Sequence, residues 1–352
     1  MITIIGEFFA KTEPFGLQEH RIFNSVKKQI NNNFPSSNNL IINTTWIGPQ
    51  FDNQSWPLIQ KLIANNKKFD NLFWTGIIDP VTILPDQIKE VEQALCLEKI
   101  FYIGVAFDGR CSFNTHSIVC QEEFPKYTQD ELELKDVKFL YINYNRKPKP
   151  FRIMLVEKLH EHALEKYGII SLGKPELHYD VSQGLDTDKY CILNDSTDPT
   201  NNNRFTMVKT FGGVPADFCS LGDLTVWQHH FLNVVSETEF FPWDTVFPTE
   251  KTLKPIIGMR PFIINGQTTI YDWLRRQGFR TFNHYFDGVE LENIPEYEVH
   301  NSIIAVIRYL TTLDKKEIIK IYSDMLPDLV HNRNRFFEYA QEQKYKTEHL
   351  FE

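Results

Sequence analysis

The sequence lacks the features that mark membrane, secreted and metal-stapled proteins. No apolar run approaches the ~20 residues that a membrane-spanning helix needs. The N-terminus, MITIIGEFF, has no basic region followed by a long apolar stretch, unlike a secretory signal peptide. The five cysteines are odd in number and form no CxxC pair, so neither a disulfide framework nor a zinc ribbon is expected. These absences predict a soluble, cytoplasmic protein without a membrane span.

An excess of positive charge is also missing. Asp and Glu number 46 against 37 Lys and Arg, a formal net charge of −9. This balance argues against a general electrostatic grip on nucleic acid or anionic membrane, although it is compatible with a local basic cleft. No Walker loop, GxSxG elbow or GxGxxG loop follows a strand-like segment. We therefore expect nucleic acid at most as an acceptor substrate.

What the sequence does contain is a long alternation of strand-like and helix-like segments. Strands are expected at 2–5, 39–46, 71–78, 99–107, 137–145, 168–173, 231–236, 261–265 and 280–282. Helices are expected at 19–30, 56–64, 85–97, 150–167, from about 249, and at 270–278, 296–312 and 314–345. Such alternation with short connections predicts parallel sheets flanked by helices.

The chain length predicts two domains, since 352 residues exceed what one core usually serves. The polar, acidic segment 121–136 has the composition of an interdomain connection. We therefore predict an α/β protein with two Rossmann-like domains, 1–135 and 136–352, that face a cleft, with helices at the C-terminus. In such open sheets, ligands bind beyond the carboxyl ends of the strands.

The segment FPTEKTLKP, residues 247–255, places two lysines at the start of an expected helix. Thr249 suits the N-cap and Glu250 the first turn, where the helix dipole favours negative charge. Lys251 and Lys254 are unfavourable there unless an anion binds. Because the helix follows an apolar strand, its start lies at the ligand-binding edge of a sheet, where a helix N-terminus and a lysine suit phosphate oxygens. The alternative is that both lysines are merely solvated.

A second basic segment, NYNRKPKPFR, residues 143–152, also spans the end of a strand and the start of a helix. Arg146, Lys147, Lys149 and Arg152 crowd this turn, and guanidinium groups bind phosphate through two hydrogen bonds. The alternative is a basic surface loop. Together with the first segment, the pattern favours a diphosphate site.

These segments resemble the donor-binding half of the α1,3-fucosyltransferase-like glycosyltransferases, a family with the two-domain GT-B fold. Ser236-Glu237-Thr238 stands where that family has Glu-Asn-Ser at a strand end. Phe247-Pro248-Thr249-Glu250-Lys251 is similar to its aromatic-x-Thr-Glu-Lys motif, with Phe247 in place of the usual Tyr. Arg152 corresponds to an Arg at the start of a domain-two helix. The resemblance covers residues 135–285.

The resemblance implies a role for each matching position. Arg152 and Lys251 would bind the diphosphate, with Thr249 at the helix start and Arg146 and Lys149 as secondary phosphate residues. Glu250 would bind the ribose hydroxyls.

Three further positions belong to the same expected donor site. Phe247 would pack near the base or ribose, and Glu237, like Glu239, suits sugar hydroxyls. Lys254 either reaches the same anion or pairs with Glu250 one turn back.

The catalytic base is an acid expected in the first domain, because sugar transfer with inversion needs a group that takes the acceptor's hydroxyl proton. In WTGIIDP, Asp79 follows Thr75-Gly76, close to where the family carries a Glu. Glu7 and Asp108 also follow strand-like segments and are rivals on the same topological grounds. Each of the three is also compatible with an ordinary loop acid.

The other acid and histidine clusters do not predict a metal site. Asp186-Thr187-Asp188 has the DxD pattern of metal-dependent transferases, but this triplet is common in polar loops. The pair His229-His230 lacks a third ligand at zinc-like spacing, and the HEH at 160–162 does not share one helix face. Arg260, before an expected strand, suits a carbonyl cap or an acid partner. No metal or cofactor is expected beside the donor.

The sequence thus predicts an inverting, metal-independent glycosyltransferase that moves a sugar from a GDP-sugar or UDP-sugar to a glycan or another hydroxyl acceptor. The first domain would hold the acceptor and the second the donor. Two alternatives stay open: a transferase acting on hydroxymethylated bases in DNA, and a nucleotide-sugar-binding relative without catalysis.

Overall fold

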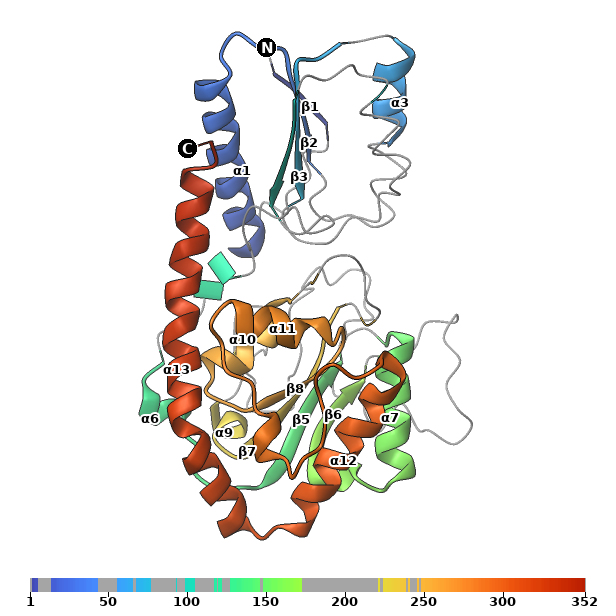
Figure 1. The fold of residues 1–352 in the computed structure, drawn as a ribbon, viewed down its shortest axis with the longest axis vertical. Helices are drawn as coiled ribbons and strands as arrows, with labels where there is room; N and C mark the ends of the chain where they lie inside the picture. The colour runs from blue at the N-terminus through green and yellow to red at the C-terminus, as the bar shows by residue number, and fades with distance from the viewer. Residues whose placement is uncertain are drawn as a thin grey trace. The chain divides into compact units, whose positions relative to one another are not determined.

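The computed structural model describes residues 2–5, 14–43, 56–65, 68–76, 93, 99–104, 117–118, 120–121, 127–145, 148–172, 221, 224–238, 240, 246 and 248–351. The described strands form two parallel sheets of four strands each, flanked by helices (Figure 1). This confirms the α/β class. Among the described residues, no helix is both long and apolar enough to cross a membrane.

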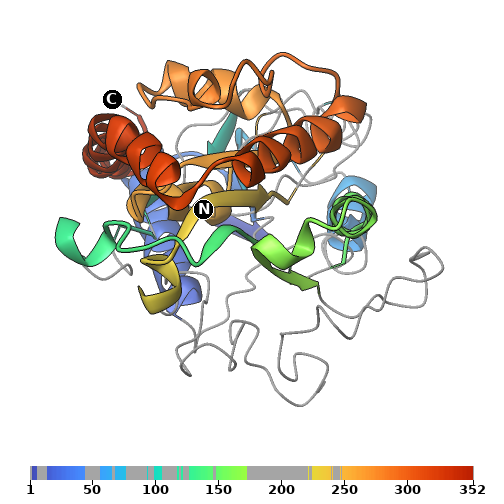
Figure 2. The same ribbon diagram turned by 90° about the horizontal axis from the view of Figure 1, so that it is seen from below.

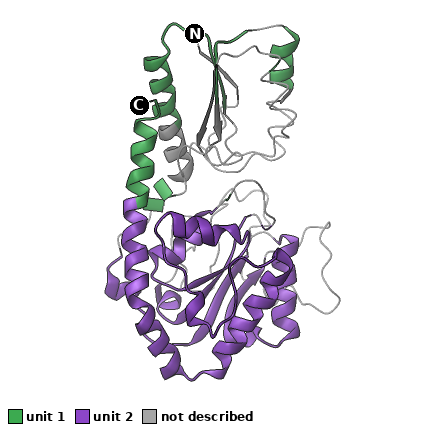
Figure 3. Cartoon of the chain, in the orientation of Figure 1, with its two compact units in different colours: residues 1–122, 243–247, 339–352 green, residues 123–242, 248–338 purple. Residues whose placement is uncertain are grey.

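The chain divides into two compact units (Figure 3). Unit 1 comprises residues 1–122, 243–247 and 339–352, and unit 2 comprises residues 123–242 and 248–338. The long helix α13 (Lys315–Glu348) contributes its last turns to unit 1 and the rest to unit 2.

Unit 1 is built on a sheet with the strand order β1-β2-β3-β4. Its elements are β1 (Ile2–Ile5), α1 (Pro14–Asn33), β2 (Asn39–Asn43), α3 (Trp56–Ala64), β3 (Asn71–Gly76) and β4 (Lys99–Gly104). The β2 and β3 strands read NLIIN and NLFWTG, and near-continuous apolar runs of this kind are typical of parallel strands buried on both faces. Many of the described side chains of this core come from β2, β3 and α1: Leu40, Ile41, Ile42, Leu72, Phe73, Phe23, Val26 and Ile30. Helix α3 adds Ile59.

The C-terminal segment completes the core of unit 1. The ring of Phe351 lies edge-on to Phe34 and Phe73, with centroids 5.3 and 5.9 Å apart. Gln29 on α1 donates to the carbonyl of Thr347 over 2.5 Å and accepts from the Leu350 amide over 3.1 Å. The last turns of α13 are therefore part of the fold of the first third of the chain, an arrangement that the sequence did not predict.

Unit 2 is built on a sheet with the strand order β6-β5-β7-β8. Its strands are β5 (Phe139–Asn145), β6 (Gly168–Leu172), β7 (His230–Ser236) and β8 (Phe262–Asn265). Its helices are α6 (Gln129–Leu132), α7 (Pro150–Glu161), η2 (Glu165–Tyr167), α9 (Leu224–Trp227), α10 (Glu250–Ile257), α11 (Thr269–Arg276), η3 (Asn283–Tyr285), η4 (Glu296–Glu298), α12 (Val299–Thr312) and most of α13.

The strand order of unit 2 reverses once, between β5 and β7. From β5 the chain crosses to β6 on one side, and β7 then pairs with the other side of β5. Right-handed crossovers in opposite directions put α7 and α10 on opposite faces of the sheet. Helix α12 packs on α7, β5 and β8 and so shares the α7 face. In the view from below, α7 and α13 are seen nearly end-on while α12 runs across the view (Figure 2).

Several element predictions need correction. Residues 280–282 are not a strand, because they lead directly into η3. The helix expected at 150–167 ends at Glu161, since Ala163 adopts a left-handed φ of 51° and the chain continues as η2. The helix expected at 85–97 lies outside the described residues, apart from residue 93. The expected helix end at Gly278 is confirmed, with α11 ending at Arg276 and Gly278 at φ 84°.

Candidate functional site

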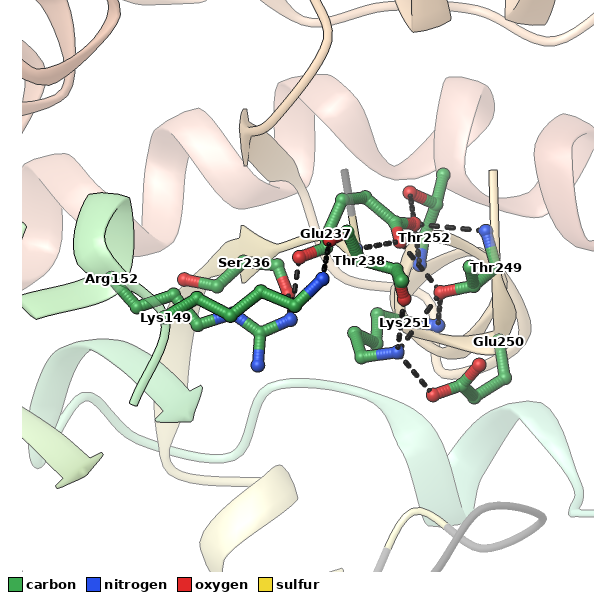
Figure 4. Close-up of polar contacts among 9 residues, drawn as sticks. All are labelled: Lys149, Arg152, Ser236, Glu237, Thr238, Thr249, Glu250, Lys251 and Thr252. Atoms are coloured by element: carbon green, nitrogen blue, oxygen red, sulfur yellow. Dashed lines mark hydrogen bonds and ion pairs between the residues drawn. The ribbon is translucent and has the colours of Figure 1, made fainter. Parts of the chain in front are cut away.

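The strand order places the candidate site at the carboxyl ends of β5 and β7. Open α/β sheets bind ligands in the crevice at the point where the strand order reverses. In unit 2 this point lies between β5 and β7. Lys149 and Arg152 follow β5 at the start of α7, and the segment from Glu237 to Lys251 follows β7 and opens α10 (Figure 4).

The start of α10 follows from local sequence chemistry. Thr249 is the N-cap, with extended backbone angles, and its Oγ1 accepts a hydrogen bond from the Lys251 amide over 3.3 Å. The first helical residue is Glu250, and the apolar side chains of Leu253, Ile256 and Ile257 are buried. The N-cap expected at Thr249 is therefore confirmed.

Glu237, the first residue after β7, holds this helix start through its carboxylate. Its side chain is fully buried and receives five hydrogen bonds from the protein. Thr249 donates through its amide (3.0 Å) and its hydroxyl (2.6 Å). Thr252 does the same (3.2 and 2.6 Å), and the Thr238 amide donates over 3.0 Å. A carboxylate at a helix N-terminus is favoured by the helix dipole. The negative charge that stabilises the start of α10 therefore comes from the Glu237 carboxylate of the chain itself.

Lys251 folds back over the same helix start. Its Nζ lies 2.7 Å from Glu250 Oε1 and 3.2 Å from the hydroxyl oxygens of Thr238 and Thr249. Its side chain is 31% exposed, whereas that of Glu250 is 8% exposed. The ammonium group is thus positioned by three oxygens and still reaches solvent.

Two more cations approach the end of β7 from the α7 side (Figure 4). The buried guanidinium of Arg152 donates to the carbonyls of Glu237 (2.5 Å) and Ser236 (3.3 Å). The Lys149 ammonium donates to the carbonyl of Thr238. Thus Arg152, Lys149 and Lys251, from two different helices, all contact residues 236–238 or their neighbours.

The formal charges of this cluster favour an anion. Lys149, Arg152 and Lys251 contribute three positive charges, and Glu237 and Glu250 contribute two negative ones, so the sum is +1. The charge of Glu237 already serves the start of α10. Of the three cations, Lys149 and Lys251 are partly exposed and Arg152 is buried.

Other residues singled out in the sequence lie elsewhere. Lys254 is partly exposed in the last turn of α10, one turn beyond Glu250. Outside the described residues lie the acids Glu7, Asp79 and Asp108, the donor-site candidates Arg146, Phe247 and Glu239, and the DxD triplet at 186–188. Their roles stay predictions.

His230 and Arg260 form a buried structural cluster away from the carboxyl ends, whereas His229 is partly exposed and its Nδ1 contacts the Thr225 carbonyl. His230 Nδ1 lies 3.0 Å from the Val226 carbonyl and its Nε2 lies 2.8 Å from the Asn233 amide nitrogen, which suits the neutral ring. Burial, with the charge of Arg260, lowers the pKa of His230 to about 3. Arg260 donates to the carbonyls of Trp227, His230 and Met259 and to the Tyr322 hydroxyl. Of the two predicted roles, a carbonyl cap or a partner of an acid, the carbonyl cap is confirmed.

The described residues contain no group of three or more His, Cys, Asp or Glu side chains that could hold a metal ion. In the HEH segment, His160 pairs with Glu165 over 3.3 Å, and His162 lies 2.9 Å from Arg308. These contacts tie α7 to its neighbours and do not converge.

Sequence reasoning missed the threonines that complete the site. Thr238 and Thr252 each bond Glu237, and Thr238 also contacts Lys251. The spacing Thr249-x-x-Thr252 could have indicated that both threonines contact one group, because residues three apart at a helix start face the same side. Nothing in the sequence indicated that the carboxylate facing them comes from Glu237, twelve residues earlier than Thr249.

Comparisons with known proteins identify no relative: no family model matches the chain, and no curated protein or solved structure is similar to it.

Proposed function

We propose that this chain is a glycosyltransferase that moves a sugar from a nucleotide diphosphate sugar to a hydroxyl acceptor, with inversion and without a metal ion. The observation that supports this most is the convergence of Lys149, Arg152 and Lys251 on the end of β7, where the strand order of the sheet reverses. The motifs that resemble the α1,3-fucosyltransferase-like family contain these same residues. The proposal includes a GT-B-like arrangement, with residues 1–135 on the acceptor side and 136–352 on the donor side.

In the proposed reaction the leaving group is a nucleoside diphosphate, whose negative charge grows as the sugar departs. Fixed cations at that position lower the barrier by stabilising the developing charge. We assign the diphosphate to Lys251 and Arg152, with Lys149 as a secondary contact, and the ribose to Glu250. The amides of Thr249 and Thr252 already donate to Glu237, so cationic side chains carry the proposed phosphate contacts.

The proposed base is an acid of the first domain, with Asp79 preferred over Glu7 and Asp108. An Asp79→Asn variant is expected to keep donor binding and to lose turnover. Full turnover in that variant would transfer the assignment to one of the two rivals.

Thermal unfolding with GDP, UDP and their sugar conjugates, each with and without EDTA, tests the donor site. A ligand at one hundred times its Kd stabilises the folded state by about 2.7 kcal/mol. Lys251→Met, which keeps the aliphatic stem and removes the charge, is expected to weaken binding at least tenfold. The matched control is Lys320→Met, which removes a 77% exposed lysine paired with Asp324.

The outcomes separate the alternatives. If no nucleotide shifts the unfolding temperature, the donor-site assignment is wrong, and if EDTA abolishes the shift, a metal ion takes part. Binding without turnover on any hydroxyl acceptor would indicate a non-catalytic relative. Transfer to hydroxymethylated DNA, but not to glycans, would identify the DNA-modifying alternative.

A further inference from the structure

A row of buried polar side chains crosses the carboxyl ends of three neighbouring strands in unit 2. Asn143 on β5 donates to Ser236 Oγ on β7 over 3.0 Å, and Asn265 on β8 donates to the same oxygen over 3.1 Å. His300 on α12 lies 3.0 Å from Asn265 Oδ1. Because α12 packs on β5 and β8, the row lies on the face of the sheet that carries α7 and α12.

The row continues to Asn145, the last residue of β5, and the bonds fix which way its amide faces. Asn143 Nδ2 donates to the main-chain carbonyl of Val234 over 2.8 Å, and a carbonyl can only accept. Asn143 Oδ1 therefore faces Asn145, whose Nδ2 donates to it over 2.5 Å. The remaining polar atom of the Asn145 side chain must be its acceptor, Oδ1.

This acceptor has no hydrogen-bond partner among the described residues, although the Asn145 side chain is fully buried. The main-chain amide of Asn145 is satisfied, since it donates to Ser171 Oγ over 3.1 Å. Native proteins pair nearly all buried polar atoms, so a single unpaired acceptor within a paired row calls for a partner from outside the chain.

The position of Asn145 indicates what that partner is. It ends β5 at the reversal of the strand order, on the face that carries α7, and α7 begins with the cationic residues Lys149 and Arg152. An acceptor needs a neutral hydroxyl or N–H donor. Ionised phosphates offer only acceptor oxygens, so the donor belongs to another part of a ligand whose phosphates meet the cations.

We infer that Asn145 Oδ1 is a binding residue that accepts a hydrogen bond from the nucleoside part of a nucleotide diphosphate, either a nucleobase N–H or a ribose hydroxyl. This inference rests on the proposed function and extends it from the phosphates to the nucleoside. Asn143, Ser236, Asn265 and His300 act as the row that orients the Asn145 amide.

The test compares three probes, GDP, UDP and inorganic pyrophosphate, by calorimetry on the wild-type chain and on Asn145→Leu, which keeps a similar volume. The expected result is a loss of about tenfold or more in affinity for at least one nucleotide, with pyrophosphate affinity within about twofold of wild type. The matched control, Asn233→Leu, removes another buried asparagine from the same sheet and is expected to leave both affinities within about twofold.

A second measurement needs no variant. Wild-type affinity is compared between the nucleotide and analogues that lack one donor each: a 2′-deoxy, a 3′-deoxy and a base N-methylated diphosphate. One analogue is expected to lose about tenfold, and it identifies the donor group. Equal affinity for all the analogues overturns the inference, as does an equal loss of pyrophosphate and nucleotide in Asn145→Leu. If the wild type binds neither nucleotide nor pyrophosphate, the proposed function itself fails and this inference fails with it.

Discussion

Replacement of Glu237 by glutamine tests whether the charge of this buried carboxylate stabilises the start of α10. The substitution keeps the size of the side chain and removes its charge. One amide oxygen can replace the carboxylate oxygen that the Thr249 amide and both Thr252 donors contact. The amide nitrogen then occupies the place of the other oxygen, which accepts from the Thr249 hydroxyl and the Thr238 amide.

The free-energy cost of Glu237→Gln depends on whether the Thr249 hydroxyl and the Thr238 amide can find new partners. The Thr249 hydroxyl can accept from the new amide only by giving up one of the two bonds that it accepts from Lys251, and the Thr238 N–H cannot reverse its role. A buried donor that loses its partner costs about 1–3 kcal/mol, at the low end for the part-buried Thr238 amide. Loss of the charge at the helix N-terminus costs about 0.5–2 kcal/mol more. We expect Glu237→Gln to destabilise the structure around α10 by about 2–3 kcal/mol.

Hydrogen exchange of the amides in residues 249–257 is the appropriate assay, because global unfolding of a chain with two units is not reliably two-state. The control is Glu131→Gln, the same substitution at an exposed helix start where Glu131 bonds Thr128. Glutamine also serves in this capping box, so the control is expected to cost less than about 0.5 kcal/mol. Equal exchange rates at α10 in wild type and Glu237→Gln would refute the inference that the Glu237 carboxylate stabilises the start of this helix.

Three further perturbations test other parts of the structure. In Gly258→Ala, the new Cβ would lie 2.1 Å from the Trp227 ring, so we expect unit 2 to lose about 3 kcal/mol of stability, measured by hydrogen exchange of β7. A second change, Trp227→Leu, should recover part of this loss, and unchanged exchange in Gly258→Ala would contradict the packing. Burial lowers the pKa of His230 to about 3 and of His300 to about 4, below the 6.5 of the unfolded chain. The unfolded state therefore binds more protons below pH 6.5. The free energy of unfolding of unit 2, measured by hydrogen exchange corrected for the intrinsic exchange rate, should fall by up to about 2.7 kcal/mol per pH unit as the pH is lowered from 6 to 4.5. His300→Gln should reduce this slope by about half. Phe351→Ala is expected to destabilise unit 1 by about 3 kcal/mol, measured by hydrogen exchange of α1. Exchange of β7, in unit 2, should stay unchanged. Equal losses of protection in α1 and β7 would contradict the assignment of the C-terminus to unit 1.

Much of the local structure could be predicted from the sequence. The segment 56–64 matches α3, and the start of α13 lies within one residue of its expected position. Thr249 was predicted as an N-cap because its hydroxyl and the neighbouring Glu250 belong to the same short segment. Such features depend on residues within one turn of one another, so the sequence order already contains the interaction.

Two element predictions failed for tertiary reasons. Residues 280–282 have strand-like composition, but Arg280 is held by α13, where its amide donates to Asn332 and its guanidinium contacts Asp328. The helix at 150–161 stops because the chain turns through left-handed Ala163 to reach β6, which pairs with β5. In both places contacts with distant residues outweigh the local preference.

The sequence by itself determined the α/β class and the two basic segments at 143–152 and 247–255. Only the tertiary structure decided that these segments meet, because the strand order that brings β5 beside β7 depends on pairing across about ninety residues. It also decided what the charges near Lys251 do. The carboxylate of Glu237 neutralises the helix start although it lies twelve residues before Thr249 in the sequence. At that separation the chain order does not show which donors a buried carboxylate contacts, so only the folded structure reveals this pairing.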